Sequence, residues 1–105
     1  MRESTVEAHF VARAKAAGHG TRKVKWIGMN SAPDRVLMVK ARKLCAGIDC
    51  AWCQPKGRTI WVELKRPKKD AEDAQAREHQ RMREFGQEVV VLNTIEAVDA
   101  FMESL

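Results

Sequence analysis

The chain has 105 residues, of which 45% are hydrophobic and 31% charged, and its formal net charge is +5. This length fits one domain, which we expect to span residues 1–105, and the hydrophobic fraction excludes wholesale disorder. No apolar run approaches the roughly 20 residues that span a bilayer, and no signal peptide is recognised, so we expect a cytoplasmic location and no membrane partner.

A first helix is predicted from Ser4 to about Ala17. Ser4 and Glu7 have the spacing of a capping box, and Gly18 and Gly20 are expected to stop the helix. Glu7 borders the apolar face, which leaves two interpretations open: a capping residue, or an acid directed at a functional site. The positions expected on the apolar face are Val6, Phe10, Ala14 and Ala17.

Three strands are predicted next, at residues 21–27, 35–39 and 60–65. The third strand reads Ile-Trp-Val-Glu-Leu-Lys, and side chains alternate faces along a strand. Its apolar set can therefore pack against a helix, while Glu63 and Lys65 share the opposite face. An ordinary solvated face is the alternative interpretation of that charged pair.

The connection between the second and third strands, at about 41–57, is expected to be an insertion loop. It holds Cys45, Cys50 and Cys53, and the last two have the C-x-x-C spacing of zinc ligands. A closed structural Zn²⁺ site needs four ligands, and His9 or His19 could supply the fourth. Three reduced thiols in a cytosolic loop are the alternative, and a disulfide is disfavoured.

The remaining elements are a helix, a strand and a last helix. Asp70 or Asp73 can cap the first of these helices, which is predicted to run to about Phe85. Residues 88–92 form a continuous apolar strand, and Thr94 caps the last helix. His79 could touch a phosphate or be a surface histidine. One face of the helix that ends near Phe85 is expected to hold Ala71, Ala74, Gln75, Glu78, Met82 and Phe85.

The predicted order is αβββαβα, an α/β fold in which helices flank a mixed β-sheet. The first three strands are expected to form a meander, and a right-handed helical crossover then leads to a parallel strand. Charge is unevenly spread along this order. Residues 35–69 hold a net charge of +8, whereas residues 70–105 hold −6.

A basic middle segment fits a polyanionic partner, so nucleic acid is the favoured interpretation over simple solubility. The expected DNA-binding residues are Arg35, Lys40, Arg42, Lys43, Arg66, Lys68, Lys69 and His79.

Asp34 begins one strand and Glu63 lies near the end of the next, so in an antiparallel pair the two carboxylates meet. They could share one divalent cation, with the carbonyl of Leu64 as a third oxygen ligand. Lys65 could then steady an attacking water or a phosphate oxygen, which is the chemistry of metal-dependent phosphodiester hydrolysis. A turn residue that accepts local N–H groups is the alternative for Asp34.

These residues resemble the P-D…(D/E)-x-K pattern of restriction-endonuclease-like nucleases, and more narrowly a stand-alone VRR-NUC domain of the type common in phages and bacteria. The resemblance covers nearly the whole chain, although the family usually has a shorter connection where the cysteines lie. The matching stretches are Pro33-Asp34-Arg35, Val62-Glu63-Leu64-Lys65-Arg66-Pro67, and Gln75-Ala76-Arg77-Glu78-His79 followed by Gly86 and an apolar strand.

The resemblance implies a Mg²⁺-dependent DNA endonuclease, with Mn²⁺ as a substitute, that acts as a homodimer on branched DNA such as four-way (Holliday) junctions. It places Glu7, Asp34, Glu63 and the carbonyl of Leu64 around the metal, and Gln75 joins Lys65 in the catalytic set. The location would then be bacterial, or the host cytoplasm if a phage encodes the protein. The alternatives are a non-catalytic nucleic-acid-binding module with a zinc-binding cysteine loop, and a nuclease subunit of a larger assembly.

Overall fold

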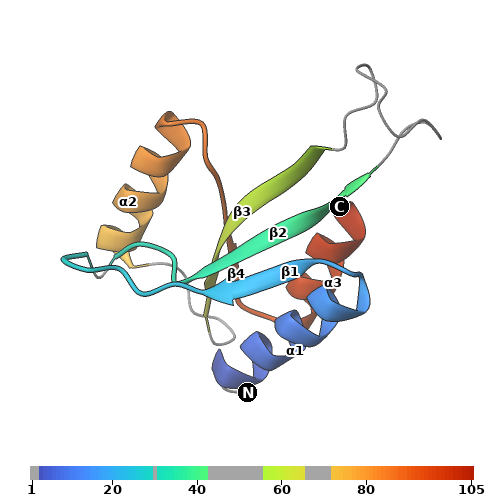
Figure 1. The fold of residues 1–105 in the computed structure, drawn as a ribbon. Helices are drawn as coiled ribbons and strands as arrows, with labels where there is room; N and C mark the ends of the chain where they lie inside the picture. Colours follow the sequence, from blue (N-terminus) through green and yellow to red (C-terminus); the bar gives the residue numbers. More distant parts are fainter. Residues whose placement is uncertain (1–2, 30, 43–55, 66–71) are drawn as a thin grey trace.

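The structure, a computed structural model, describes residues 3–29, 31–42, 56–65 and 72–105. Its elements follow the order αβββαβα that the sequence predicts (Figure 1). Within the described residues, no helix has the length and apolar character needed to cross a membrane. The elements are α1 (Glu3–Ala16), β1 (Gly20–Lys23), β2 (Arg35–Arg42), β3 (Lys56–Leu64), α2 (Asp73–Glu84), β4 (Glu88–Leu92) and α3 (Ile95–Ser104).

The four strands form one sheet in the order β1-β2-β3-β4. The first three strands make an antiparallel meander, and β4 lies parallel to β3. A parallel neighbour requires a crossover connection, which α2 provides. β3 is therefore an interior strand that has an antiparallel partner on one side and a parallel partner on the other.

Helices lie on both sides of this sheet (Figure 1). Helices α1 and α3 pack together on one side, where the main apolar core joins them to the inner side chains of β2, β3 and β4. Helix α2 lies on the other side and contacts β4. The core comprises Val6, Phe10, Ala14, Leu37, Ile60, Val62, Leu64, Leu92, Val98 and Met102.

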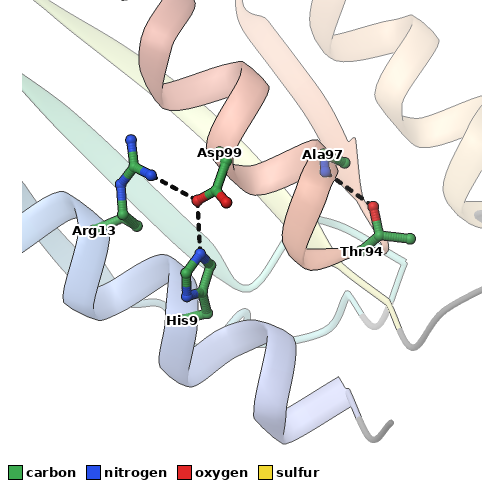
Figure 2. Close-up of polar contacts among 5 residues, drawn as sticks. All are labelled: His9, Arg13, Thr94, Ala97 and Asp99. Carbon is green, nitrogen blue, oxygen red and sulfur yellow. Dashed lines mark hydrogen bonds and ion pairs between the residues drawn. The ribbon is translucent and has the colours of Figure 1, made fainter.

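Polar contacts between α1 and α3 lie beside this core (Figure 2). Asp99 accepts a hydrogen bond from Arg13 and lies in hydrogen-bond contact with His9, both at 2.7 Å. At the start of α3, the Thr94 hydroxyl accepts the backbone N–H of Ala97 at 2.9 Å, as the sequence predicts for an N-cap. These contacts fix the two helices that cover one side of the sheet.

The first helix differs in detail from its prediction. It begins at Glu3, so Ser4 lies inside the helix and is not its N-cap. Ala17 is exposed and lies beyond the last helical residue, so it does not belong to the buried face. Gly18 follows with a positive φ of 81°, a conformation in which glycine is favoured after a helix.

The strands differ from their predictions mainly at their ends. β1 ends at Lys23, not at Ile27, and Ile27 is 97% exposed in the connection that follows. β2 extends to Arg42 and β3 begins at Lys56, so both strands enter the segment predicted to be a loop. The pairing register shifts by one residue between Val39 and Arg42, which indicates a bulge there.

The inner face of α2 also differs from its prediction. Met82 is buried as expected, but the other buried residue of the helix is His79. Ala74 and Phe85 are exposed, the latter by 83%. The N-cap is Glu72, which forms a capping box with Gln75, so neither Asp70 nor Asp73 is the cap.

Candidate active site

The candidate site lies where β2 begins and β3 ends. Arg35 is paired with Val62 in the antiparallel register, so one further step places Asp34 opposite Glu63. The backbone N–H of Val24 donates to the carbonyl of Asp34 at 2.7 Å, which continues the β1–β2 ladder by one residue. Asp34 is thus held between two strands, as the sequence predicts for a residue at a strand entrance.

Glu63 projects away from the main core and toward α2. Its neighbours Val62 and Leu64 are buried in the core beneath α1 and α3, and alternation sends Glu63 to the opposite face. Glu63 is only 5% exposed, and its Oε1 lies 3.6 Å from Nε2 of His79, which is 1% exposed. The central strand therefore carries a buried carboxylate beside a buried imidazole.

The environment of His79 disfavours its protonated form. Burial is the main cause that lowers the pKa of His79, and the nearby cation of Arg83 acts in the same direction. Lys65 also lowers the pKa of His79, whereas Glu78 opposes these effects.

Lys65 is positioned by the parallel side of the sheet. Its backbone N–H donates to the carbonyl of Leu92 at 2.9 Å, which extends the β3–β4 ladder past Leu64. By alternation its side chain shares the face of Glu63, and it is half-buried. The E-x-K spacing thus places an acid and an amine on one face, as predicted.

Glu7 lies on the α1 side and makes different contacts. Its carboxylate lies 3.4 Å from Nε of Arg35 and 3.6 Å from Nζ of Lys23. Arg35 alternates with Asp34, so Glu7 meets the sheet on the face opposite to Glu63. A metal-binding role for Glu7 stays a prediction, and it would require this carboxylate to exchange its two cationic partners for the metal.

Gln75 is occupied at the start of α2. Its side-chain oxygen accepts the backbone N–H of Glu72 at 3.0 Å as part of the capping box. Gln75 is half-buried on the same side of α2 as Glu78, His79 and Met82. Its catalytic role stays a prediction that this contact neither supports nor opposes.

The expected DNA-binding residues lie in different environments. Lys40 is exposed, whereas the Arg35 side chain is 12% exposed and is held by Glu7 and Thr21. His79 is buried, so a contact with phosphate would require it to become exposed. Outside the described residues lie Lys43, Cys45, Cys50, Cys53, Arg66, Lys68 and Lys69, and the side chain of Arg42 is not described.

The structure adds three residues that the sequence interpretation did not place at the site. A pocket of about 500 Å³ borders Asp34, and Lys23, Lys25 and Trp26 contribute to its wall. The alternation of basic residues with Val24 and Trp26 was a usable signal, because such interleaving is typical of nucleic-acid-binding surfaces.

The donor set fits a hard divalent cation. Asp34, Glu63 and the carbonyl of Leu64 offer oxygen ligands at the meeting point of two strands, which suits Mg²⁺. Within the described part of the chain, no group of three or more His, Cys, Asp or Glu side chains is arranged to hold a metal. Two carboxylates are nevertheless enough, because Mg²⁺ commonly binds through one or two carboxylates and keeps several waters.

Comparisons with known proteins find similarity in sequence and in overall fold. No family model matches the sequence. A solved structure described as "VRR_NUC domain" superposes with a TM-score of 0.75 at 27% identity, over 96% of this chain and 94% of that one. The protein named "Putative nuclease p44" of Acyrthosiphon pisum secondary endosymbiont phage 1 is 29% identical over 94 residues, which are 90% of this chain and 85% of that protein.

The chain therefore resembles a stand-alone VRR-NUC domain of the phage type in both fold and sequence. Its four-stranded mixed sheet with flanking helices matches the restriction-endonuclease-like fold, which confirms the predicted fold class and the predicted resemblance.

Proposed function

We propose that this protein is a Mg²⁺-dependent endodeoxyribonuclease that hydrolyses phosphodiester bonds in branched DNA such as four-way junctions, with Mn²⁺ as a substitute metal. The observation that carries the proposal is the cross-strand register that sets Asp34 opposite Glu63, with Lys65 directly after the end of β3. Burial of Glu63 supports it, because a carboxylate seldom lies in a protein interior unless it is paired or used.

Asp34 and Glu63 would hold the cation together with the carbonyl of Leu64. When bound, Mg²⁺ supplies a water of lowered pKa and neutralises charge on the phosphate. The ammonium group of Lys65 donates hydrogen bonds to the attacking water or to a phosphate oxygen, which orients the nucleophile. His79 packs beside Glu63 and restricts the positions that its carboxylate can adopt.

DNA would approach the face on which Asp34 and the basic pocket residues lie. Lys25 and Lys40 are exposed and can neutralise phosphates along the backbone. A branched substrate and a homodimer belong together in this proposal, because a two-fold dimer presents two active sites to the two strands of a four-way junction.

The proposal is tested with labelled linear duplex, flap and four-way junction DNA of matched sequence, each with Mg²⁺, with Mn²⁺ and with chelator. We expect cleavage only with a divalent metal, and the fastest cleavage on the junction. Sedimentation of the protein and of its junction complex should show two copies per junction. Equal rates on linear and branched DNA would overturn the substrate selectivity, and metal-independent cleavage would overturn the mechanism.

Substitution separates catalysis from binding. Glu63→Gln and Lys65→Ala should each slow cleavage by at least about 100-fold, because changes even in the surroundings of metal ligands cost 10–100-fold. Binding of junction DNA in chelator should stay within a few-fold of wild type. Glu103→Gln, which alters an exposed acid on α3, is the matched control and should cleave normally. Full cleavage by purified Glu63→Gln would exclude Glu63 from the active site.

A further inference from the structure

We propose that the pocket beside Asp34 binds one unpaired nucleobase of the DNA substrate. Its volume of about 500 Å³ lies within the range of roughly 300–1,000 Å³ that is usual for small-molecule sites. Apolar side chains make up most of its wall, and two lysines and one carboxylate complete it. The lining residues among those described are Lys23, Val24, Lys25, Trp26, Met29, Ala32 and Asp34.

Trp26 provides a fixed aromatic wall. Its indole N–H donates to the carbonyl of Pro33 at 2.6 Å, and Pro33 itself is buried. Its ring also packs against Trp61, with the ring centroids 5.3 Å apart and the planes tilted by 47°. A ring that is held on two sides loses little conformational freedom when a base stacks on it, which favours binding.

The charges at the pocket fit a nucleotide better than an apolar ligand. Lys25 is an exposed residue of the wall, and a lysine beside an aromatic ring is the combination by which proteins hold single-stranded nucleic acid. Lys23 also lines the pocket, but its ammonium group lies 3.6 Å from the Glu7 carboxylate. The ring contacts the base, and the ammonium group of Lys25 contacts a neighbouring phosphate. An apolar side chain from a protein partner would leave Lys25 without a role.

The position of the pocket defines which base it holds. Asp34 belongs both to the pocket wall and to the proposed metal site, so a base in the pocket lies next to the phosphate at that site. Bases inside a duplex are stacked and paired, and extruding one costs free energy that is smallest where the base is already unpaired. The pocket therefore favours cleavage beside unpaired nucleotides, a specificity that rests on the proposed nuclease function.

Base binding can be measured without cleavage, in chelator. The probe is a DNA hairpin with one bulged nucleotide, and the matched probe has an abasic residue at the bulge, which removes the base and keeps every phosphate. We expect wild-type protein to bind the abasic hairpin about 5- to 160-fold more weakly, the range that stacking of one base on an aromatic side chain implies. A fluorescent 2-aminopurine at the bulge should be quenched on binding.

Substitutions test whether Trp26 causes the preference for the hairpin with the intact bulged base. Trp26→Leu should bind both hairpins with the same affinity, because the base no longer has a ring to stack on. Trp26→Phe keeps a ring and should retain most of the preference for the intact bulge. Phe85→Leu, which changes an aromatic residue that is 83% exposed and does not line the pocket, should behave as wild type.

The possible results separate this inference from the proposed function. Equal affinity of wild-type protein for the two hairpins overturns the base-binding pocket, even if junction DNA is cleaved. Folded Trp26→Leu could instead lose affinity for both hairpins by the same factor and so keep the preference for the intact bulge. That result would mean that Trp26 only supports Pro33, and it would also overturn the base-binding pocket. A base-dependent affinity without any metal-dependent cleavage would support the pocket and refute the nuclease.

Discussion

Magnesium binding should stabilise the folded protein, and Asp34→Asn should remove most of that effect. Asp34 and Glu63 are the two carboxylates that the register places opposite each other at the candidate site. Asparagine keeps the shape of Asp34 and removes its charge, so the substitution changes the ligand and leaves the strand entrance intact. Any ligand that binds only the native state raises stability by mass action.

The size of the effect follows from the dissociation constant for magnesium. At a Mg²⁺ concentration of 100 times Kd, the wild-type protein should gain about 2.7 kcal/mol of unfolding free energy. For a domain of this size that is about 11 °C in Tm, at about 4 °C per kcal/mol. If Asp34→Asn weakens binding about 100-fold, the gain at the same Mg²⁺ concentration falls to about 0.4 kcal/mol, or about 2 °C.

Thermal melting followed by circular dichroism measures this directly. Wild type and Asp34→Asn are each melted in chelator and in a Mg²⁺ series that defines Kd. Asp73→Asn, which changes an exposed acid in the first turn of α2, should keep the wild-type response. Equal magnesium-induced shifts in wild type and Asp34→Asn would show that Asp34 is not a ligand and only forms the turn after Pro33.

Three further predictions concern charge and capping. DNA affinity should fall steeply with salt, because the exposed lysines release counterions from several phosphates, and a flat plot of log affinity against log salt would refute this. A hydrogen bond from His9, aided by Arg13, lowers the pKa of Asp99. Asp99→Asn should therefore reduce Tm at pH 7. The difference in Tm between wild type and Asp99→Asn should vanish as the pH falls through the lowered pKa of Asp99. Thr94→Ala should cost about 0.5–2 kcal/mol of stability by leaving the N–H of Ala97 without its cap, whereas the exposed Ser104→Ala should melt near wild type.

The element order could be predicted because several elements carry local signals. Thr94 is a strong N-cap residue directly before an amphipathic stretch, and residues 89–92 are apolar without interruption, as in a strand covered on both faces. The opposition of Asp34 and Glu63 also follows from local information, because the two residues lie at the facing ends of consecutive antiparallel strands.

The inner face of α2 could not be predicted from its apolar residues. Phe85 is apolar, but it caps the end of the helix and points into solvent. His79 is polar, yet it is buried because α2 crosses the sheet face on which Glu63 projects. The two side chains meet only in the folded chain, 3.6 Å apart, so neither buried position can be assigned from the local sequence alone.

The crossover also limits the routes by which a substrate could reach the proposed site. Helix α2 connects two parallel strands, so it must lie over the sheet face that carries Glu63, and there His79 covers that carboxylate. Asp34, which directly precedes the neighbouring strand β2, is only half-buried and lines the pocket together with Trp26. In the proposed nuclease, a phosphate would therefore approach Glu63 past Asp34, from the β1–β2 connection. The pocket borders Asp34 on that route, so a base held in it would belong to the same DNA strand that the proposed nuclease cuts.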